Sequence, residues 1–302
     1  MNNSPIIVVA NTGDSSISVI DSRTWEEIDR IGLVPSSGPY DLVAASTEGQ
    51  VLTSNYYSDS ISKIDILTGQ MLGSVIIGRR PCYMSYDKER GLAFVTNSDS
   101  DSISVVDAYE MKLVSQVTVG SLPQGIDFDP FTQNLAIANI NSNEVFIVDT
   151  RDFFIRGKIK MEGYPFQVKY SNNGRGLYVS CATPQNCDAS SIAHMDTVDY
   201  KVIHEFKLGG MPGRLLNTKE DGYLLVASMS SGGIEIIDLK NKRLESKMAI
   251  NGMTHGIAMD AEEKYVYITN PDDDSINVID WRRADRIKTI KVGKEPNGIL
   301  II

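Results

Sequence analysis

The sequence predicts an all-β fold, a seven-bladed β-propeller built from four-stranded antiparallel blades. Three observations lead to this prediction. A short motif that ends in aspartate recurs seven times along the 302 residues at nearly constant intervals. Each interval has room for four short strands, and its apolar runs are separated by the Gly, Asn, Asp and Ser residues typical of turns. The chain also begins and ends partway through a repeat, as expected if both ends share one blade.

The repeat is clearest in its third predicted strand, for example "SISVID" (residues 16–21) and "SISVVD" (residues 102–107). A second strand precedes it and often ends in Asn, as in "VLTSN" to Asn55 and "AFVTN" to Asn97. A fourth strand follows it and leads to a Gly and usually a Pro, as in "VTVGSLP" to Pro123, where the next first strand begins. The closing aspartates lie 42 to 47 residues apart and are Asp21, Asp65, Asp107, Asp149, Asp196, Asp238 and Asp280.

The two ends of the chain should complete one blade. The first apolar run, Ile6 to Asn11, has the pattern of a second strand, and the last, Pro296 to Ile302, has the pattern of a first strand. Pairing of these two runs would leave no open seam in the ring and would hold both termini in place. The sequence therefore predicts a single domain over residues 1–302.

The motifs "FVTN", "YITN", "SVVD" and "VGxxP" resemble the YVTN-type repeat of YncE-like propellers, and the resemblance covers essentially the whole chain. It implies the same seven-bladed fold. It implies no single activity, because members of the family include periplasmic, surface-layer and enzyme-associated proteins and one fold supports many functions. The WD40 propeller is the alternative type, but no Gly-His…Trp-Asp pattern recurs here.

Composition and charge narrow the classes of partner. The formal net charge is −10 and the pI is about 4.9, which disfavours general binding to nucleic acids or anionic membranes, although a local basic patch stays possible. No apolar run is long enough for a membrane-spanning helix, and the N-terminus lacks the features of a signal peptide. We expect a soluble monomer that is cytoplasmic as written, or periplasmic or secreted if a signal peptide was removed.

The aspartates divide into two groups. The one that closes every third strand should be structural, with its carboxylate accepting hydrogen bonds from backbone N–H groups one or two residues further on. The second group lies between the second and third strands, as in "SDSDS" (residues 98–102), and should form an acidic rim that favours solubility or a basic partner. Counted as an EF-hand from Asp99, that segment fails at Ile103 and Ser104. The second group comprises Asp14, Asp59, Asp99, Asp101, Asp188 and Asp272 to Asp274.

Candidate binding residues lie just after the Pro of each repeat, where the innermost strands begin. These positions should surround the mouth of the central channel, and they vary between blades in a way that offers aromatic surface, hydrogen bonds and positive charge. Arg79 and Arg80 should lie nearby, whereas Cys82 should lie across the ring from His255, so that the two share no metal. The predicted ligand-binding residues are Tyr40, Tyr83, Gln124, Phe166, Gln167, Arg214, His255 and Asn297.

No catalytic or metal motif such as G-x-S-x-G, H-E-x-x-H or C-x-x-C occurs. The leading hypothesis is therefore a non-catalytic propeller, without cofactor or metal, that binds a protein partner or a small ligand at its rim or channel mouth. The alternative is a lactonase- or lyase-like enzyme that uses Asp41, Asp127, Arg214 and His255. Binding of single-stranded nucleic acid is a third, weaker hypothesis because of the acidic balance.

Two further features concern the fifth blade. Its loop "SCATPQNCDASS" (residues 180–191) is about five residues longer than its counterparts and is either a recognition element or a tolerated insertion. Cys181 and Cys187 could pair across this loop in an oxidising compartment or remain two thiols. The spacing also places His194 in a third strand and His204 in a fourth strand.

Overall fold

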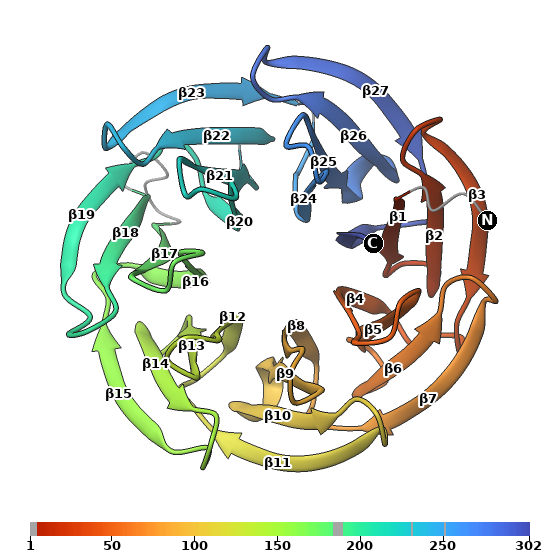
Figure 1. Cartoon of the computed structure of the whole chain (residues 1–302), viewed down its shortest axis with the longest axis horizontal. Helices are drawn as coiled ribbons and strands as arrows, with labels where there is room; N and C mark the ends of the chain where they lie inside the picture. Colours follow the sequence, from red (N-terminus) through yellow and green to blue (C-terminus); the bar gives the residue numbers. More distant parts are fainter. Residues whose placement is uncertain (1–4, 184–189, 231, 251) are drawn as a thin grey trace. The chain divides into compact units, whose positions relative to one another are not determined.

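The computed structural model describes residues 5–183, 190–230, 232–250 and 252–302. Within these residues, 28 strands form seven four-stranded antiparallel sheets, and two short 3₁₀ turns, η1 (Ser98–Ser100) and η3 (Pro271–Asp273), are the helical segments (Figure 1). This confirms the predicted seven-bladed β-propeller. None of the helical segments in the described ranges has the length or apolarity to cross a membrane.

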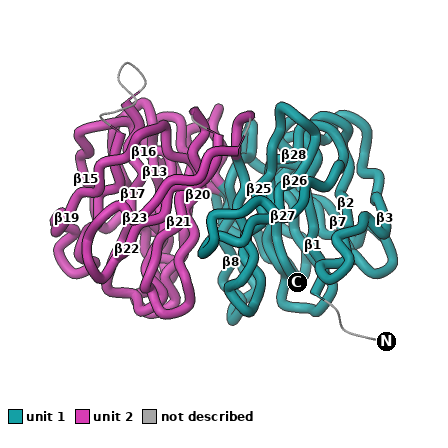
Figure 2. Tube along the Cα trace, turned by 90° about the horizontal axis from the view of Figure 1, so that it is seen from above, with its two compact units in different colours: residues 1–95, 104–116, 255–302 teal, residues 96–103, 117–254 magenta. Residues whose placement is uncertain are grey.

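The residues group into two compact units, coloured separately in Figure 2. Unit 1 contains residues 1–95, 104–116 and 255–302, and unit 2 contains residues 96–103 and 117–254. A single domain over residues 1–302 stays a prediction.

Unit 1 holds the first, second and seventh sheets and most of the third. The first sheet consists of β28 (Pro296–Ile301), β1 (Ile6–Asn11), β2 (Ser16–Asp21) and β3 (Glu26–Gly32). The second consists of β4 (Pro39–Ala44), β5 (Gln50–Asn55), β6 (Ser60–Asp65) and β7 (Gln70–Ile76). The third consists of β8 (Pro81–Asp87), β9 (Leu92–Asn97), β10 (Ser102–Asp107) and β11 (Lys112–Thr118). The seventh consists of β24 (Ile257–Met259), β25 (Tyr265–Asn270), β26 (Ser275–Asp280) and β27 (Asp285–Lys291).

Unit 2 holds the fourth, fifth and sixth sheets. The fourth consists of β12 (Pro123–Asp129), β13 (Asn134–Asn139), β14 (Glu144–Asp149) and β15 (Ile155–Lys160). The fifth consists of β16 (Tyr164–Tyr170), β17 (Gly176–Ala182), β18 (Ser191–Asp196) and β19 (Val202–Lys207). The sixth consists of β20 (Pro212–Asn217), β21 (Tyr223–Ser228), β22 (Gly233–Asp238) and β23 (Arg243–Ala249).

The two ends of the chain meet in the first sheet, as predicted. Strand β28 pairs antiparallel with β1, with Ile301 opposite Ile7. The backbone N–H of Ile6 donates to the carbonyl of Ile302 at 2.8 Å, and the N–H of Ile302 donates to the carbonyl of Ile6 at 3.0 Å. The last strand therefore completes the blade that the first strand begins, and both termini are held by main-chain hydrogen bonds.

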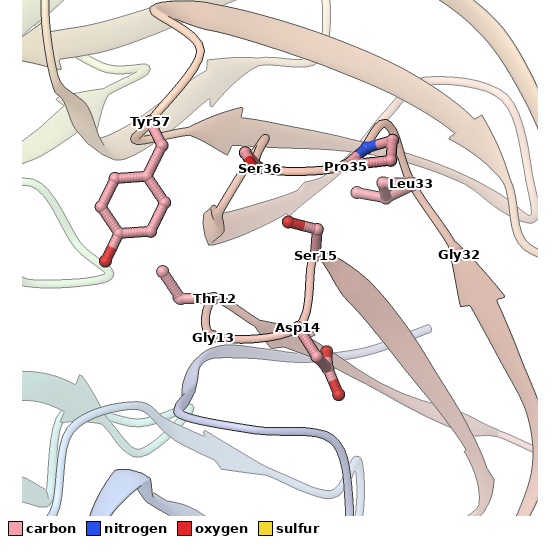
Figure 3. Close-up of a pocket in the computed structure, with 9 residues that line it drawn as sticks. All are labelled: Thr12, Gly13, Asp14, Ser15, Gly32, Leu33, Pro35, Ser36 and Tyr57. Atoms are coloured by element: carbon pink, nitrogen blue, oxygen red, sulfur yellow. The ribbon is translucent and has the colours of Figure 1, made fainter.

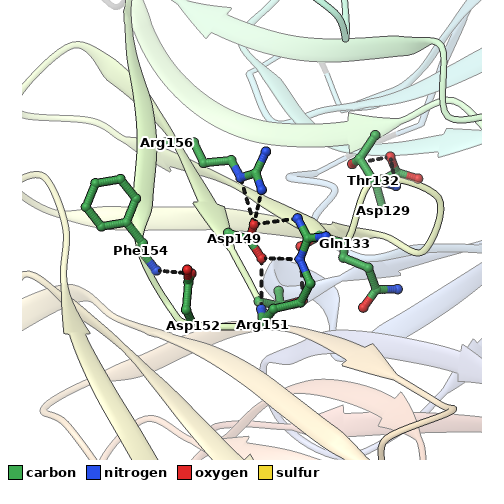
Figure 4. Close-up of polar contacts among 9 residues, drawn as sticks. Asp129, Thr132, Gln133, Asp149, Arg151, Asp152, Phe154 and Arg156 are labelled. Atoms are coloured by element: carbon green, nitrogen blue, oxygen red, sulfur yellow. Dashed lines mark hydrogen bonds and ion pairs between the residues drawn. The ribbon is translucent and has the colours of Figure 1, made fainter.

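The aspartate that closes each third strand is structural, as predicted, although its partners lie two and three residues on rather than one and two. The Oδ1 of Asp107, for example, accepts the N–H of Tyr109 at 2.8 Å and of Glu110 at 3.0 Å. Asp149 has the same role and also pairs with the guanidinium groups of Arg151 and Arg156 (Figure 4). These bonds hold the tight turn between the third and fourth strands.

Several aspartates of the expected acidic rim also have a structural role, which the sequence analysis did not assign. Asp59, Asp101 and Asp274 occupy the left-handed region, with φ near +50°, just before a third strand. Each carboxylate accepts a backbone N–H from the loop that leads to a first strand; Asp101, for example, accepts the N–H of Leu122 at 2.9 Å. Aspartate suits this position because its short polar side chain tolerates left-handed backbone and can accept nearby N–H groups.

The recurring Asn and Ser residues contact one another. The Nδ2 of Asn55 donates to the hydroxyls of Ser60 at 3.0 Å and Ser62 at 2.8 Å, and Asn11 makes the same pair of bonds. The apolar residues between them fill the space between neighbouring sheets; in unit 1, one such core packs Val8 and Val19 with Leu42 and Val51. Burial of each such side chain contributes about 1.5–3 kcal/mol.

Candidate functional site

The first strand of most blades contains a bulge just after its Pro. In the second sheet Pro39 pairs with Asn55 but Asp41 pairs with Ser54, so Tyr40 has no partner of its own in the ladder. The same shift occurs in β12, β16, β20 and β28. A bulge changes the direction of a side chain, so the strand pattern of the sequence does not indicate where Tyr40 points.

Three of the eight predicted site residues meet within unit 1. The hydroxyl of Tyr40 lies 3.0 Å from Nε2 of His255, and the hydroxyl of Tyr83 lies 3.1 Å from the same nitrogen. The rings of Tyr83 and His255 are nearly parallel, at 9°, whereas the Tyr40 ring meets both edge-on. These three residues lie in β4, in β8 and in the segment before β24, so their contact connects parts of three blades.

A series of contacts between planar side chains leads from His255 towards solvent. The ring of Tyr56 stacks on Tyr40 at 5.4 Å and 25°, and the guanidinium of Arg80 lies 5.5 Å from the centre of the Tyr56 ring. The ring of Tyr57 meets Tyr56 edge-on at 5.3 Å. Tyr83 is 1% exposed and Tyr57 is 58% exposed. We call Tyr40, Tyr56, Tyr83 and His255 the Tyr–His cluster.

The cluster supplies a neutral hydroxyl at Tyr40. Burial raises the pKa of Tyr40 well above its usual range, and the nearby Tyr83 and Cys82 raise it further. The Tyr40 hydroxyl is therefore protonated at neutral pH and cannot serve as a base. It can donate or accept a hydrogen bond while its ring offers apolar surface.

Close backbone packing holds the cluster in place. A Cβ on Gly256 would lie 2.3 Å from the carbonyl oxygen of Asn297, and one on Gly298 would lie 2.8 Å from the carbonyl oxygen of Tyr40. Only glycine permits this approach. Asn297, another predicted site residue, is 9% exposed and donates from Nδ2 to the hydroxyl of Thr12 at 2.6 Å, and its ligand-binding role stays a prediction.

The expectation that Cys82 lies across the ring from His255 and shares no metal with it stays a prediction. Tyr83, its neighbour in β8, contacts His255 through its hydroxyl at the end of a long side chain. The Cys82 thiol itself is buried and donates to the carbonyl of Arg80 at 3.4 Å. Within the described ranges, no group of three His, Cys, Asp or Glu residues is placed to hold a metal ion.

The other four predicted site residues belong to unit 2. Gln124 donates from Nε2 to the hydroxyl of Ser98 at 3.0 Å. Gln167 is 3% exposed, and its Nε2 has no hydrogen-bond partner among the residues the structure describes. Phe166 lies in β16 and Arg214 in β20, both half-buried. A ligand-binding role for this group stays a prediction.

The histidines of the fifth blade lie where the sequence placed them. His194 is in β18 and His204 is its cross-strand partner in β19. The His194 ring stacks on Tyr178, and burial lowers the pKa of this imidazole. Cys187 and half of the long loop, residues 184–189, lie outside the described residues, so neither the thiol pairing nor the recognition role of the loop is tested.

A pocket of about 360 Å³ lies beside Tyr57 in unit 1 (Figure 3). The Tyr57 ring, Thr12, Ser15 and Ser36 surround it, and the carboxylate of Asp14 points away from it. Sequence reasoning missed Tyr56 and Tyr57 as site residues. The signal was the "NYY" segment at residues 55–57, because no other second strand of the chain is followed by two aromatic residues.

Comparisons with solved structures find the same fold at low sequence identity. A functionally unknown protein from Desulfotomaculum acetoxidans matches with a TM-score of 0.85 and 13% identity over 98% of both chains. Hydrazine synthase of Kuenenia stuttgartiensis matches with a TM-score of 0.81 and 18% identity over 89% of this chain and 96% of that chain. The periplasmic gluconolactonase PpgL of Pseudomonas aeruginosa matches with a TM-score of 0.81 and 15% identity over 99% of each.

No curated protein sequence matches the chain. The model of the YNCE-like beta-propeller family, in contrast, matches residues 1–302, which is the whole sequence. This chain therefore belongs to the YNCE-like β-propeller family.

Proposed function

We propose that this protein is a non-catalytic propeller that binds a small, planar, negatively charged molecule at the Tyr–His cluster. The observation that carries this proposal is the continuous series of contacts from the Arg80 guanidinium through the stacked rings of Tyr56 and Tyr40 to the edge-on ring of His255. It joins an exposed, positively charged outer end to a buried, polar inner end.

The chemistry of the stack suits a flat anion. Tyr56 and Tyr57 present aromatic faces and edges, which favour planar partners. The guanidinium of Arg80 lies over the Tyr56 ring, and Arg79 next to it in the sequence is also exposed; such groups can pair with a carboxylate or phosphate through charge-assisted hydrogen bonds. The pocket next to Tyr57 has a volume in the range of small-molecule sites.

The carboxylates that a lactonase-like mechanism would need are already engaged. Asp41 is 2% exposed, and its Oδ2 accepts the backbone N–H of Met84 at 2.9 Å. The carboxylate of Asp127, in unit 2, accepts hydrogen bonds from the Nζ of Lys169 at 3.0 Å and from the backbone N–H of Tyr170 at 2.8 Å. Similarity to a gluconolactonase at 15% identity concerns the fold alone. These observations support binding over turnover.

The test compares small aromatic carboxylates with their neutral amides. Benzoate and nicotinate should bind in isothermal titration calorimetry, and benzamide and nicotinamide should bind at least about tenfold more weakly because they lack the charge. Tyr56→Ala and Arg80→Gln should each weaken carboxylate binding by a similar factor.

Tyr109→Ala is the matched control, because Tyr109 is also exposed and has a cation, Lys63, over its ring. Tyr109 lies on the turn after β10 and next to Gly91, which follows the end of β8. Tyr83, in contrast, lies near the beginning of β8. The Tyr109→Ala variant should bind like the wild type. The proposal fails if no carboxylate binds, or if the three variants behave alike. Hydrolysis of gluconolactone that is lost in His255→Ala would establish the enzyme alternative instead.

A further inference from the structure

The outer edge of the seventh blade is strongly basic in a chain that is otherwise acidic. Residues 282–294 contain six basic residues and one acidic residue, a net charge of +5, whereas the whole chain carries −10. The six basic side chains are all exposed. We call them the basic edge: Arg282, Arg283, Arg286, Lys288, Lys291 and Lys294.

This charge is arranged along an open strand. Strand β27 is the last strand of its sheet, in the order β24-β25-β26-β27, so one side of its backbone has no strand partner among the described residues. Val278 pairs with Lys288 but Ile279 pairs with Arg286, which makes Ile287 a bulge. The segment after the bulge, residues 288–291, keeps regular pairing with β26 and is the part of the edge that can accept another strand.

The internal contacts of the basic edge leave its charge available to a partner. Lys291 pairs with Asp273 at 2.9 Å and Arg283 with Asp280 at 3.7 Å, and the two basic side chains are 69% and 79% exposed. Exposed pairs of this kind contribute little to stability and are screened by salt. A partner that supplies several carboxylates in a row can therefore compete with them.

We propose that the basic edge docks an acidic protein segment, which adds to β27 as a further strand. Main-chain hydrogen bonds to the open edge would supply affinity, and alternate acidic side chains would lie beside Arg286 and Lys291. These two residues share a face because they pair with Ile279 and Ser275, four residues apart on β26, whereas Lys288 pairs with Val278 and points to the other face. This inference does not depend on the small-ligand site proposed above.

A protein strand fits this surface better than a nucleic acid does. The Nζ of Lys288 donates to the carbonyl of Thr24 at 3.4 Å, which places β27 beside the turn that leads into β3 (Figure 1). Glu26 and Asp29 of β3 are exposed. A long polyanion that continued from β27 would meet these carboxylates, whereas a short acidic strand would end before them. An open sheet edge also offers peptide N–H and C=O groups that a phosphate backbone cannot pair with in register.

The experiment measures fluorescence anisotropy of a labelled peptide of alternating Glu and Val with the full chain at about 50 mM and about 200 mM salt. The peptide should bind, and more weakly at the higher salt. Arg286→Glu/Lys291→Glu should weaken binding at least about tenfold, and Arg286→Gln/Lys291→Gln should weaken it less. The matched control Lys112→Glu/Lys201→Glu makes the same change in net charge at exposed lysines elsewhere and should keep binding within about twofold.

Two further peptides separate strand addition from charge attraction. The same sequence N-methylated at alternate residues cannot donate along one edge and should lose most of its affinity, and an alternating Gln and Val peptide should not bind. Each variant should show the far-ultraviolet circular dichroism of the wild type. Equal loss of binding in the control variant, unchanged binding of the methylated peptide, or tighter binding of oligo-dT or phosphatidylserine vesicles than of the acidic peptide would overturn the proposal.

Discussion

Replacement of Gly298 by Ala should destabilise the protein, because β28 passes close to β4 at this residue. A Cβ on residue 298 would lie 2.8 Å from the carbonyl oxygen of Tyr40 and 2.9 Å from the Cα of Asp41. Both atoms belong to the backbone, so neither can rotate away as a flexible side chain could. Relaxed contacts between such atoms are about 3.5–4.0 Å, so the two strands must separate by roughly 0.5–1 Å. Overpacking of this kind costs about 1–3 kcal/mol.

The assay is urea denaturation of Gly298→Ala beside Gly32→Ala. A Cβ on Gly32 would meet nothing within 4 Å, and Gly32 does not have a left-handed φ. Gly32→Ala should therefore be neutral or stabilise the protein by up to about 1 kcal/mol, since alanine reduces the freedom of the unfolded chain. Gly298→Ala should also change the imidazole NMR signals of His255, which contacts Tyr40. Equal unfolding midpoints for the two variants would refute the reasoning.

Two other predictions concern the aspartate turns and the Tyr–His cluster. Hydrogen bonds from Arg151 hold the pKa of Asp149 well below its usual range, so Asp149→Asn should lower the free energy of unfolding by about 1–3 kcal/mol at pH 7. The stabilisation by the Asp149 carboxylate is complete above the unfolded pKa of about 3.9 and is lost as pH falls towards the folded pKa. Urea denaturation should show that the difference in free energy of unfolding between the wild type and Asp149→Asn becomes smaller below about pH 4. A difference that stays constant down to about pH 3 would contradict the assignment. Tyr40→Phe and Tyr83→Phe should be coupled by at least about 0.5 kcal/mol in a double-mutant cycle, because both hydroxyls contact one nitrogen of His255. Additive losses of stability would show that the two contacts are independent.

The fold was predictable because its signals are local and repeated. The segment "SISVVD" was predicted as a third strand and is β10, from Ser102 to Asp107. The aspartate at its end turns the chain through hydrogen bonds to residues two and three positions away, so the same short sequence forms the same turn in each blade. Closure of the first blade by the C-terminal strand followed from the phase of the repeat at the two ends.

The candidate site was predictable only in part. Tyr40, Tyr83 and His255 were chosen by their position after the Pro of each repeat, and the structure brings these three together. The sequence could not show that Tyr56 stacks on Tyr40, because Tyr56 follows a second strand and its contact depends on the bulge at Tyr40. Nor could it show that Asp41 and Asp127 are engaged by the N–H groups of neighbouring blades.

The sequence by itself determined the number of blades, the order of strands and the turn chemistry, because hydrophobic period and turn residues act over a few positions of the chain. The tertiary structure decided which variable residues meet. The contact between Tyr40 and His255 joins residues 215 positions apart, and it exists because Gly256 and Gly298 let the backbones of β24, β28 and β4 approach closely. The basic edge depends on both the sequence and the tertiary structure. Its charge is visible in the sequence, and only the sheet order shows that this charge lies along an open strand.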